Sequence, residues 1–210
     1  QTYGPYTSAM VRRFASWVLK RAYSICARDD ASAQLVKHLT GRDACISTDI
    51  AFRLPVDIRR LPEKTGKRIG INVSGLLWNG GYTGDDQFGL TVDYRTYLFG
   101  LIEWCLDNKM EVWLIPHVIM AQEIPDPEND LAICRLLQQK YRQCHIPDVL
   151  DTPMVIKGYL SQMAVVIGAR MHAVIGAFSC KVASVPFAYS KKFGDLFGSL
   201  DYHCLIDGRT

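Results

Sequence analysis

The first quarter of the chain places apolar residues at helical spacing and then in short runs. Apolar side chains recur about every 3.6 positions across residues 8–23, which predicts a helix; they are Val11, Phe14, Ala15, Val18 and Ala22. Residues 25–27 and 44–46 are predicted strands, and residues 31–39 are a predicted helix that ends near Gly41. Residues 54–67 contain two prolines and several charges, which indicates a linker.

From Arg68 onward, short apolar strands alternate with amphipathic helices. The predicted strands cover residues 68–73, 111–115, 149–150, 164–168, 182–187 and 203–206. The predicted helices cover residues 92–108, 131–141, 153–163 and 190–200, with caps expected at Asp93 or Thr91, at Asn129-Asp130 and at Thr152. This alternation is typical of a parallel sheet with right-handed crossovers, so the predicted fold class is α/β with a Rossmann-like sheet.

Composition and charge exclude several functional classes. Of the 210 residues, 49% are hydrophobic and 21% are charged, as in ordinary globular proteins. The formal charge of +3 is small and evenly spread, so no nucleic-acid partner is expected. No apolar run approaches the roughly 20 residues that cross a bilayer, so no transmembrane segment is expected and the protein is predicted to be soluble and cytoplasmic.

Seven cysteines are scattered along the chain without a Cys-x-x-Cys pair or a close Cys/His spacing. This pattern is typical of free thiols in a reducing cytoplasm. It disfavours a structural zinc site, and no metal is expected.

The most informative segment is residues 164–177, where an apolar strand runs through a glycine turn into a helix. Arg170 and His172 lie on this turn. Open α/β sheets bind ligands at the carboxyl ends of their strands, and the helix that follows directs free N–H groups toward an anion. We therefore interpret Arg170 and His172 as an anion site; the alternative is that they cap the helix, bond a carbonyl or face solvent.

Polar residues also follow three other predicted strands. Asn72 and Ser74 follow the first, His117 the second, and Lys191 lies in the Tyr-Ser-Lys-Lys run after the strand at 182–187. Because parallel strands end at one rim, we expect these side chains to converge on one crevice. Each has an alternative: Asn72 and Ser74 would satisfy backbone groups, His117 would be structural, and adjacent lysines are more often solvated.

Residues 77–89 form a glycine-rich loop with aromatic side chains. The loop lacks the Lys-Ser/Thr that ends a phosphate-binding P-loop, and it lacks the tighter glycine spacing of a dinucleotide fingerprint. We interpret it as a mobile flap or a sugar-stacking surface, with a plain surface hairpin as the alternative.

Several segments resemble, in the same order, those of the polysaccharide pyruvyl transferase family. Residues 168–173, Gly-Ala-Arg-Met-His-Ala, resemble its signature Gly-x-Arg-Met-His-Ala. The other segments are Tyr3-Gly-Pro5, Ala27-Arg-Asp29 with Ser32, Asp49-Ile-Ala-Phe52, Gly70-Ile-Asn-Val-Ser-Gly-Leu76, Pro116-His117, Asn129-Asp130 and Tyr189-Ser-Lys191. The resemblance implies a GT-B-like enzyme with two Rossmann-like halves. Residues 1–62 are then expected to be a remnant of the N-terminal half with its linker, and residues 63–210 the donor-binding C-terminal half.

The resemblance also implies an activity. A pyruvyl group would pass from phosphoenolpyruvate to a sugar of a polysaccharide or cell-wall glycan precursor, leaving a cyclic ketal and releasing phosphate. Phosphoenolpyruvate is a substrate, and no cofactor is expected. The anionic donor needs cations and N–H donors, and the candidates to bind it are Arg170, Met171, Asn72, Ser74 and Lys191. The enol carbon needs a proton, so His172 is the candidate catalytic residue and His117 a second acid or base.

Two other functions stay open. A nucleotide-sugar glycosyltransferase would use a similar two-domain scaffold with a different donor. A non-catalytic binding fragment would keep the anion pocket without turnover, because most of the N-terminal half is expected to be absent. A lipid-linked acceptor would place the protein peripherally at the inner membrane face.

Overall fold

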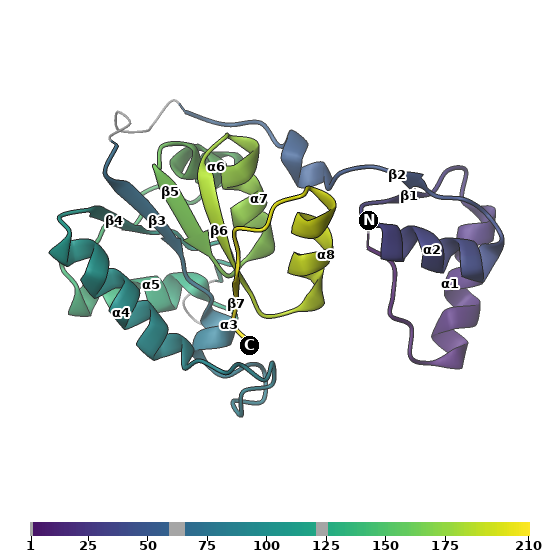
Figure 1. Ribbon diagram of the computed structural model, residues 1–210, viewed down its shortest axis with the longest axis horizontal. Helices are drawn as coiled ribbons and strands as arrows, with labels where there is room; N and C mark the ends of the chain where they lie inside the picture. Colours follow the sequence, from purple (N-terminus) through teal and green to yellow (C-terminus); the bar gives the residue numbers. More distant parts are fainter. Residues whose placement is uncertain (1, 59–65, 121–125) are drawn as a thin grey trace. The chain divides into compact units, whose positions relative to one another are not determined.

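The computed structural model describes residues 2–58, 66–120 and 126–210, with the side chains of Lys191 and Lys192 outside the description. The chain divides into two compact units (Figure 1). The N-terminal unit comprises Gln1–Phe52 and Gly194–His203, and the sheet unit comprises Arg53–Phe193 and Cys204–Thr210. The predicted domain boundary between residues 62 and 63 falls outside the described residues, so it stays a prediction.

The N-terminal unit combines helices with two short parallel strands. Its elements are α1 (Ala9–Arg21), β1 (Cys26–Ala27), α2 (Asp30–Thr40) and β2 (Cys45–Ile46), followed by the 3-10 helix η1 (Ile50–Arg53). Asp29 caps α2, and Gly41 ends it with a φ of 75°. Leu19 of α1 is buried in a small core with α2, whereas Phe14 is 64% exposed. The apolar spacing therefore predicts the helix α1 but not the face that packs.

Within the described residues, five strands form the parallel sheet of the sheet unit, in the order β4-β3-β5-β6-β7 (Figure 1). They are β3 (Arg68–Asn72), β4 (Glu111–Leu114), β5 (Val165–Gly168), β6 (Ala183–Ala188) and β7 (Ile206–Asp207). Ile71 of β3 pairs with Leu114 on one side and with Ile167 on the other, so the carboxyl ends of β3, β4 and β5 lie side by side. The predicted α/β, Rossmann-like fold is confirmed.

Helices join these strands, and most begin where the sequence predicts. They are α3 (Gly75–Trp78), α4 (Tyr94–Asp107), α5 (Asp130–Lys140), α6 (Pro153–Ser161), α7 (Met171–Ser179) and α8 (Lys191–Ser199). Asp93 caps α4 by accepting the Thr96 N–H at 2.6 Å, so Asp93 rather than Thr91 is the cap. Thr152 caps α6 ahead of a proline at its first position.

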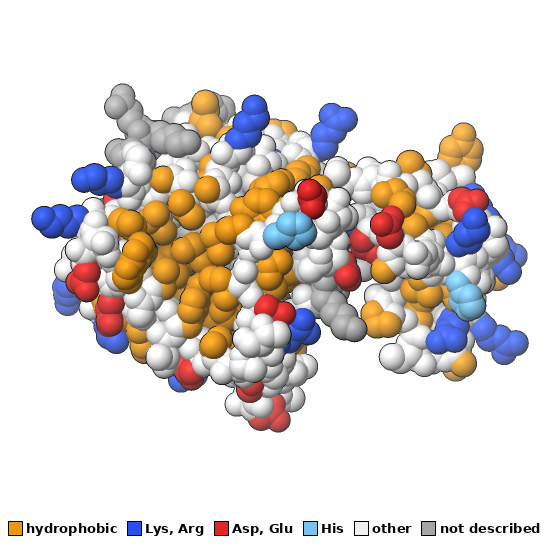
Figure 2. Space-filling model, viewed as in Figure 1, with side chains coloured by type: hydrophobic (Ala, Val, Ile, Leu, Met, Phe, Trp, Pro, Cys, Tyr) orange, Lys and Arg blue, Asp and Glu red, His pale blue; other side chains and the backbone are white. Residues whose placement is uncertain are grey.

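Two layers of helices cover the sheet. On one face, Ile69 and Ile71 of β3 pack with α4 and α5 in a buried cluster, which also holds the thiols of Cys105 and Cys134. On the other face, Val166 of β5 packs with α6 and α7. In the view of Figure 2, apolar side chains form a band over α4 and β6, and lysines and arginines are scattered around the edges.

Three segments differ from the prediction. Residues 149–150 form no strand, because His145 already bonds the outer edge of β4 through an isolated parallel bridge to Trp113. The last strand lies at Ile206–Asp207 rather than at 203–206. Residues 75–78 form α3, which was not predicted, and residues 79–93 contain no strand, so the alternative of a surface hairpin is wrong.

Close packing at Gly70 predicts opposite effects for two glycine-to-alanine substitutions. A Cβ at Gly70 would lie 2.9 Å from Cγ of Met163 and 3.2 Å from Cδ1 of Ile115. Gly70→Ala should therefore lower the free energy of unfolding by about 1–3 kcal/mol. The control is Gly100 in α4, where a Cβ would meet open space, and Gly100→Ala should raise that free energy by about 0.5–1 kcal/mol. Chemical denaturation measures both, and equal effects would contradict this packing.

Candidate active site

The predicted site residues lie at the carboxyl ends of neighbouring strands. The chain leaves β3 toward β4 on one side and leaves β5 toward β6 on the other, which is the position where open α/β sheets bind ligands. Asn72 and Ser74 lie at the end of β3, His117 follows β4, and Arg170 and His172 follow β5. The structure therefore brings these five residues to one edge of the sheet.

A buried carboxylate, that of Asp130, holds this edge together. Asp130 lies at the start of α5 and is fully buried. Its Oδ1 accepts the N–H of Gly75, the first residue of α3, at 2.8 Å. Its Oδ2 accepts the N–H groups of His117 at 3.2 Å and Val118 at 2.8 Å. One side chain thus fixes the backbone that follows both β3 and β4.

The helix cap of α5 is Asn129, whose Oδ1 accepts the Ala132 N–H at 3.4 Å. The cap expected at Asn129-Asp130 is therefore confirmed, and Asn129 rather than Asp130 provides it. The carboxylate of Asp130 bonds donors from other segments of the chain and not the first turn of its own helix.

Arg170 completes the arrangement around Asp130. Its Nη2 donates to Oδ1 of Asp130 at 2.8 Å, and its Nε lies 3.2 Å from each carboxylate oxygen. Its Nη2 also donates to the carbonyl of Glu128 at 2.9 Å, and its Nη1 lies 3.4 Å from Oε1 of Glu128. Burial alone would lower the pKa of Arg170, but the hydrogen bonds and charge of Asp130 outweigh it and raise that pKa. Most of the guanidinium fork is therefore occupied within the protein.

Asn72 and Ser74 also use their polar groups internally. The Asn72 side chain donates to the carbonyl of Ile115 at 2.8 Å and accepts the N–H of Arg170 at 2.8 Å, so it bridges the ends of β4 and β5. Oγ of Ser74 accepts the Leu77 N–H at 3.3 Å and so caps α3. Both residues are buried. Their donor-binding role stays a prediction, and the geometry gives them a structural one.

His117 and His172 form a pair of imidazoles on this edge. Their ring centroids are 6.4 Å apart and their rings are inclined by 27°. His172 is exposed, whereas Nδ1 of His117 is buried without a hydrogen-bond partner among the described residues. Burial, reinforced by positive charge on His172 and Arg170, lowers the pKa of His117 to about 4 despite the opposing effect of Asp130. His117 is therefore neutral at neutral pH and can accept a hydrogen bond there.

Two tyrosines beside Arg170 received no role from the sequence. Burial raises the pKa of Tyr189, against the opposing charge of Arg170. The hydrogen bond of Tyr82 to Glu128 raises the pKa of Tyr82, which belongs to the glycine-rich loop. The ring of Phe88, from the same loop, lies 5.0 Å from that of Tyr189. The signal for this contact was the position of an aromatic, glycine-rich loop directly after β3 and α3.

Two further predicted donor-binding residues begin helices. Met171 is the first residue of α7 and is partly buried. Lys191 is the first residue of α8, and its side chain lies outside the described residues. Their roles stay predictions.

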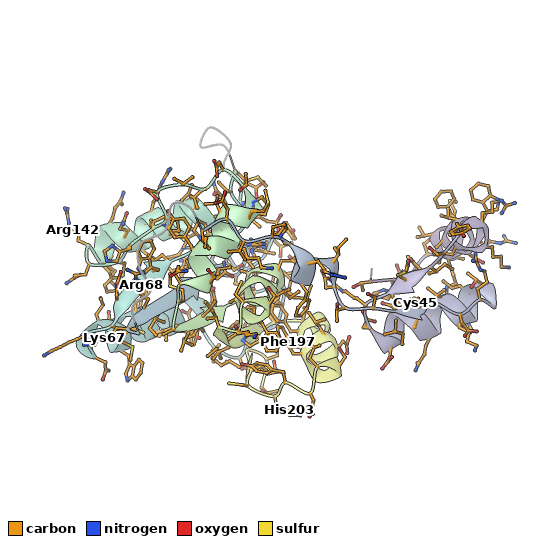
Figure 3. The ribbon with its side chains drawn as sticks, turned by 90° about the horizontal axis from the view of Figure 1, so that it is seen from above. Cys45, Lys67, Arg68, Arg142, Phe197 and His203 are labelled. Atoms are coloured by element: carbon orange, nitrogen blue, oxygen red, sulfur yellow. The ribbon has the colours of Figure 1, made fainter. Side chains whose placement is uncertain are left out.

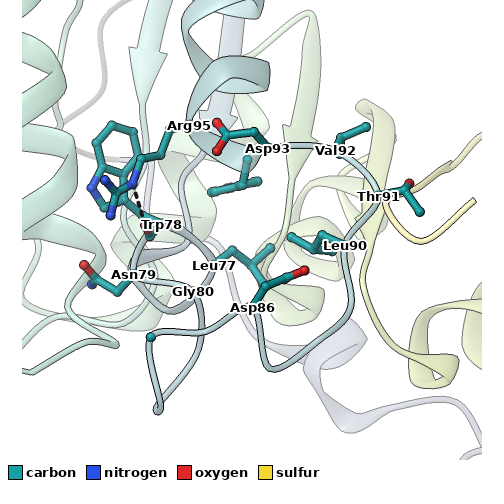
Figure 4. Close-up of a pocket in the computed structure, with 12 residues that line it drawn as sticks. Leu77, Trp78, Asn79, Gly80, Asp86, Leu90, Thr91, Val92, Asp93 and Arg95 are labelled. Atoms are coloured by element: carbon teal, nitrogen blue, oxygen red, sulfur yellow. Dashed lines mark hydrogen bonds between the residues drawn. The ribbon is translucent and has the colours of Figure 1, made fainter.

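A pocket of about 320 Å³ lies on the other side of α3, between the glycine-rich loop and the start of α4 (Figure 4). Its lining residues are Leu77, Trp78, Asn79, Gly80, Gly84, Asp86, Leu90, Thr91, Val92, Asp93, Tyr94 and Arg95. Arg95 Nε donates to the Trp78 carbonyl at 2.8 Å at one wall. The pocket is lined by Arg95 as well as by Asp86 and Asp93, and it contains neither histidine of the pair.

Neither a metal-binding cluster nor a membrane-spanning helix occurs among the described residues. Across 2–58, 66–120 and 126–210, no group of three or more His, Cys, Asp or Glu side chains is placed to hold a metal ion. No helix in the same ranges combines the length and apolar character needed to span a bilayer.

An open parallel sheet with helices on both faces defines a Rossmann-like α/β protein, and its polar carboxyl edge is where such sheets bind ligands. The chain belongs to the polysaccharide pyruvyl transferase family, whose model matches residues 1–191. The resemblance found in the sequence is thereby confirmed, and the family indicates a transferase that acts on a polysaccharide. A search of curated proteins gave no match.

The unusual environment of His117 predicts a pH dependence. Because its pKa is about 4 in the folded protein against 6.5 ordinarily, the unfolded chain takes up this proton first as the pH falls. His117 should therefore cost up to about 3 kcal/mol of stability between pH 6.5 and pH 4, and nothing above that range. NMR of the histidine ring protons, with exposed His203 as the reference, should show a His117 midpoint near 4. A midpoint near 6.5 would contradict the burial, and His117→Asn should reduce the loss of stability on acidification.

Proposed function

We propose that this protein transfers a pyruvyl group from phosphoenolpyruvate to a sugar of a polysaccharide or glycan precursor, at the carboxyl edge of its sheet. The observation that carries the proposal is the His117–His172 pair, which holds a neutral imidazole 6.4 Å from an exposed one in a member of this family. Phosphoenolpyruvate is a substrate, and the proposed reaction uses no cofactor.

The reaction sets clear demands on the site. A proton adds to the methylene carbon of phosphoenolpyruvate, and the neighbouring carbon becomes an oxocarbenium-like centre. One sugar hydroxyl attacks that carbon, the bond to the phosphate oxygen breaks, and a second hydroxyl closes the ketal. Of the two hydroxyl protons, one balances the proton taken up by carbon and the other leaves with phosphate. The site must therefore supply a proton donor, a proton acceptor and groups that attract the anionic donor.

His172 is the proposed proton donor. It is the second residue of α7, where N–H groups of the first helical turn and the helix dipole favour a bound anion. A phosphate or carboxylate bound there would favour the protonated imidazole. The backbone N–H of Met171 and the side chain of Lys191 are the further donor-binding groups in this proposal.

His117 is the proposed acceptor for a proton or hydrogen bond from the attacking hydroxyl. Its low pKa of about 4 favours the neutral imidazole at neutral pH, so of the roles that the sequence left open for His117 this proposal keeps the acceptor. His117 is only partly buried, so a hydroxyl could approach its ring from the accessible side, whereas its Nδ1 is buried. A hydroxyl bonded to the ring would be placed between the two strand ends that carry the histidines.

Calorimetric titration of the chain tests the donor. Phosphoenolpyruvate should bind, and a uridine-diphosphate sugar should not. Preference for the nucleotide sugar would favour a glycosyltransferase instead, and binding of neither would contradict a donor site in this chain.

Substitution of His172 tests the chemistry. His172→Ala should lower turnover, followed as phosphate release with sugar acceptors, by about 100-fold or more, because general acid catalysis contributes that much. Its affinity for phosphoenolpyruvate should change far less, because the imidazole acts mainly in the transition state. His203→Ala, at an exposed histidine in the N-terminal unit, is the matched control. Unchanged turnover in His172→Ala would remove the assignment.

A further inference from the structure

Asp130 takes part in no step of the proposed reaction, yet it is bonded by five N–H groups of the described residues. Three are backbone groups, those of Gly75, His117 and Val118, and two belong to Arg170. Such a carboxylate, fully buried, is costly unless the surroundings satisfy it, so its position is held tightly.

We propose that Asp130 is a positioning residue of the active site, and that Arg170 serves with it as a clamp and not as a ligand of the donor anion. The inference rests on the proposed function for its meaning in catalysis. Its structural content, that Asp130 sets the relative placement of the two histidines, stands on the contacts alone.

The contacts reach both histidines. Oδ2 of Asp130 holds the backbone N–H of His117 directly. Its bonds to Arg170 hold the N-cap residue of α7, two positions before His172. The imidazole pair therefore comes from two segments that meet at one carboxylate.

Gly75 shows how closely the clamp is packed. A Cβ on this residue would lie 2.9 Å from the backbone C and O of Asn129 and from the carbonyl of Pro127. Only a glycine lets the start of α3 approach so closely that its N–H reaches Oδ1 of Asp130 at 2.8 Å. The loop before α5 and the start of α3 thus pack closely against each other beside the strand ends.

The charges also argue against Arg170 as an anion ligand. Its guanidinium faces the carboxylates of Asp130 and Glu128, so the three groups together carry one net negative charge. Two of its three nitrogens bond Asp130 or the Glu128 carbonyl, and the third faces the Glu128 carboxylate at 3.4 Å. A trianionic donor would have to break this ion pair before the guanidinium of Arg170 could bind it.

The substitution Asp130→Asn distinguishes a positioning role of Asp130 from direct binding of the donor by Arg170, because the two roles predict opposite changes in the affinity for phosphoenolpyruvate. It removes a negative charge and frees the guanidinium, so a donor bound directly by Arg170 would bind more tightly. If Asp130 positions the site, phosphoenolpyruvate should bind at least 10-fold more weakly, and the ring-proton signals of His117 and His172 should shift. Unchanged or tighter binding with unshifted histidine signals would overturn the inference.

Glu111→Gln is the matched control. Glu111 forms an ion pair with buried Arg68, 3.0 Å from Nε, at the amino end of the same sheet, where Figure 3 labels Arg68. Both substitutions remove one carboxylate charge from a buried arginine pair, so both should lower the thermal unfolding midpoint. Only Asp130→Asn should move the histidine signals and the affinity for phosphoenolpyruvate. Equal shifts in both variants would reduce Asp130 to a stabilising residue.

Failure of the proposed function and failure of the Asp130 inference give different results. If the unaltered protein does not bind phosphoenolpyruvate, the proposed function fails, and the histidine signals of the variants still decide whether Asp130 positions the pair. If Asp130→Asn does not fold, the double variant Asp130→Asn with Arg170→Gln leaves no unpaired buried charge and should fold. Its His117 signal should be shifted, and an unshifted signal would overturn the inference.

Discussion

Two oppositely charged side chains, Asp130 and Arg170, meet at the carboxyl edge of the sheet with 0% and 8% of their surfaces exposed. Removing two charges from water costs several kcal/mol for each ion, and the cost is offset only when the geometry and the remaining hydrogen bonds are good. Here the carboxylate receives N–H groups from the backbone that follows β3 and β4, and the guanidinium also donates to the Glu128 carbonyl. The backbone of three separate segments is consequently tied to one pair of charges.

This constraint gives the two histidines different environments. His117 follows β4 and is pressed into the edge, where burial lowers its pKa to about 4. His172 is the second residue of α7 and is exposed. A reaction that takes up one proton and releases another benefits from two groups in different environments. The aromatic, glycine-rich loop adds Tyr82 and, through Phe88, a contact with Tyr189 beside the same edge.

Prediction from the sequence succeeded where the information was local or repeated. Apolar runs gave the strands, and side chains such as Asp93 and Thr152 marked helix starts, because a cap bonds a backbone N–H only a few residues away. Prediction missed the short helix α3 and wrongly placed a strand at 149–150, because both segments depend on partners that are distant in the sequence. Gly75 of α3 bonds Asp130, and His145 occupies the outer edge of β4. The sequence also left open which residue of the Asn129-Asp130 pair is the cap, since both satisfy the local rule equally well.

By itself the sequence determined the α/β class, the family and the set of polar residues at the strand ends, because periodicity, caps and the Gly-Ala-Arg-Met-His-Ala segment are written along the chain. Only the tertiary structure decided what those residues contact. The sequence favours Arg170 as an anion ligand, and the structure shows its guanidinium bonded to a carboxylate 40 positions earlier in the chain. The sequence contains no sign that Nδ1 of His117 is buried while His172 is exposed. Charge pairing and desolvation depend on distances in space, which a one-dimensional pattern does not contain.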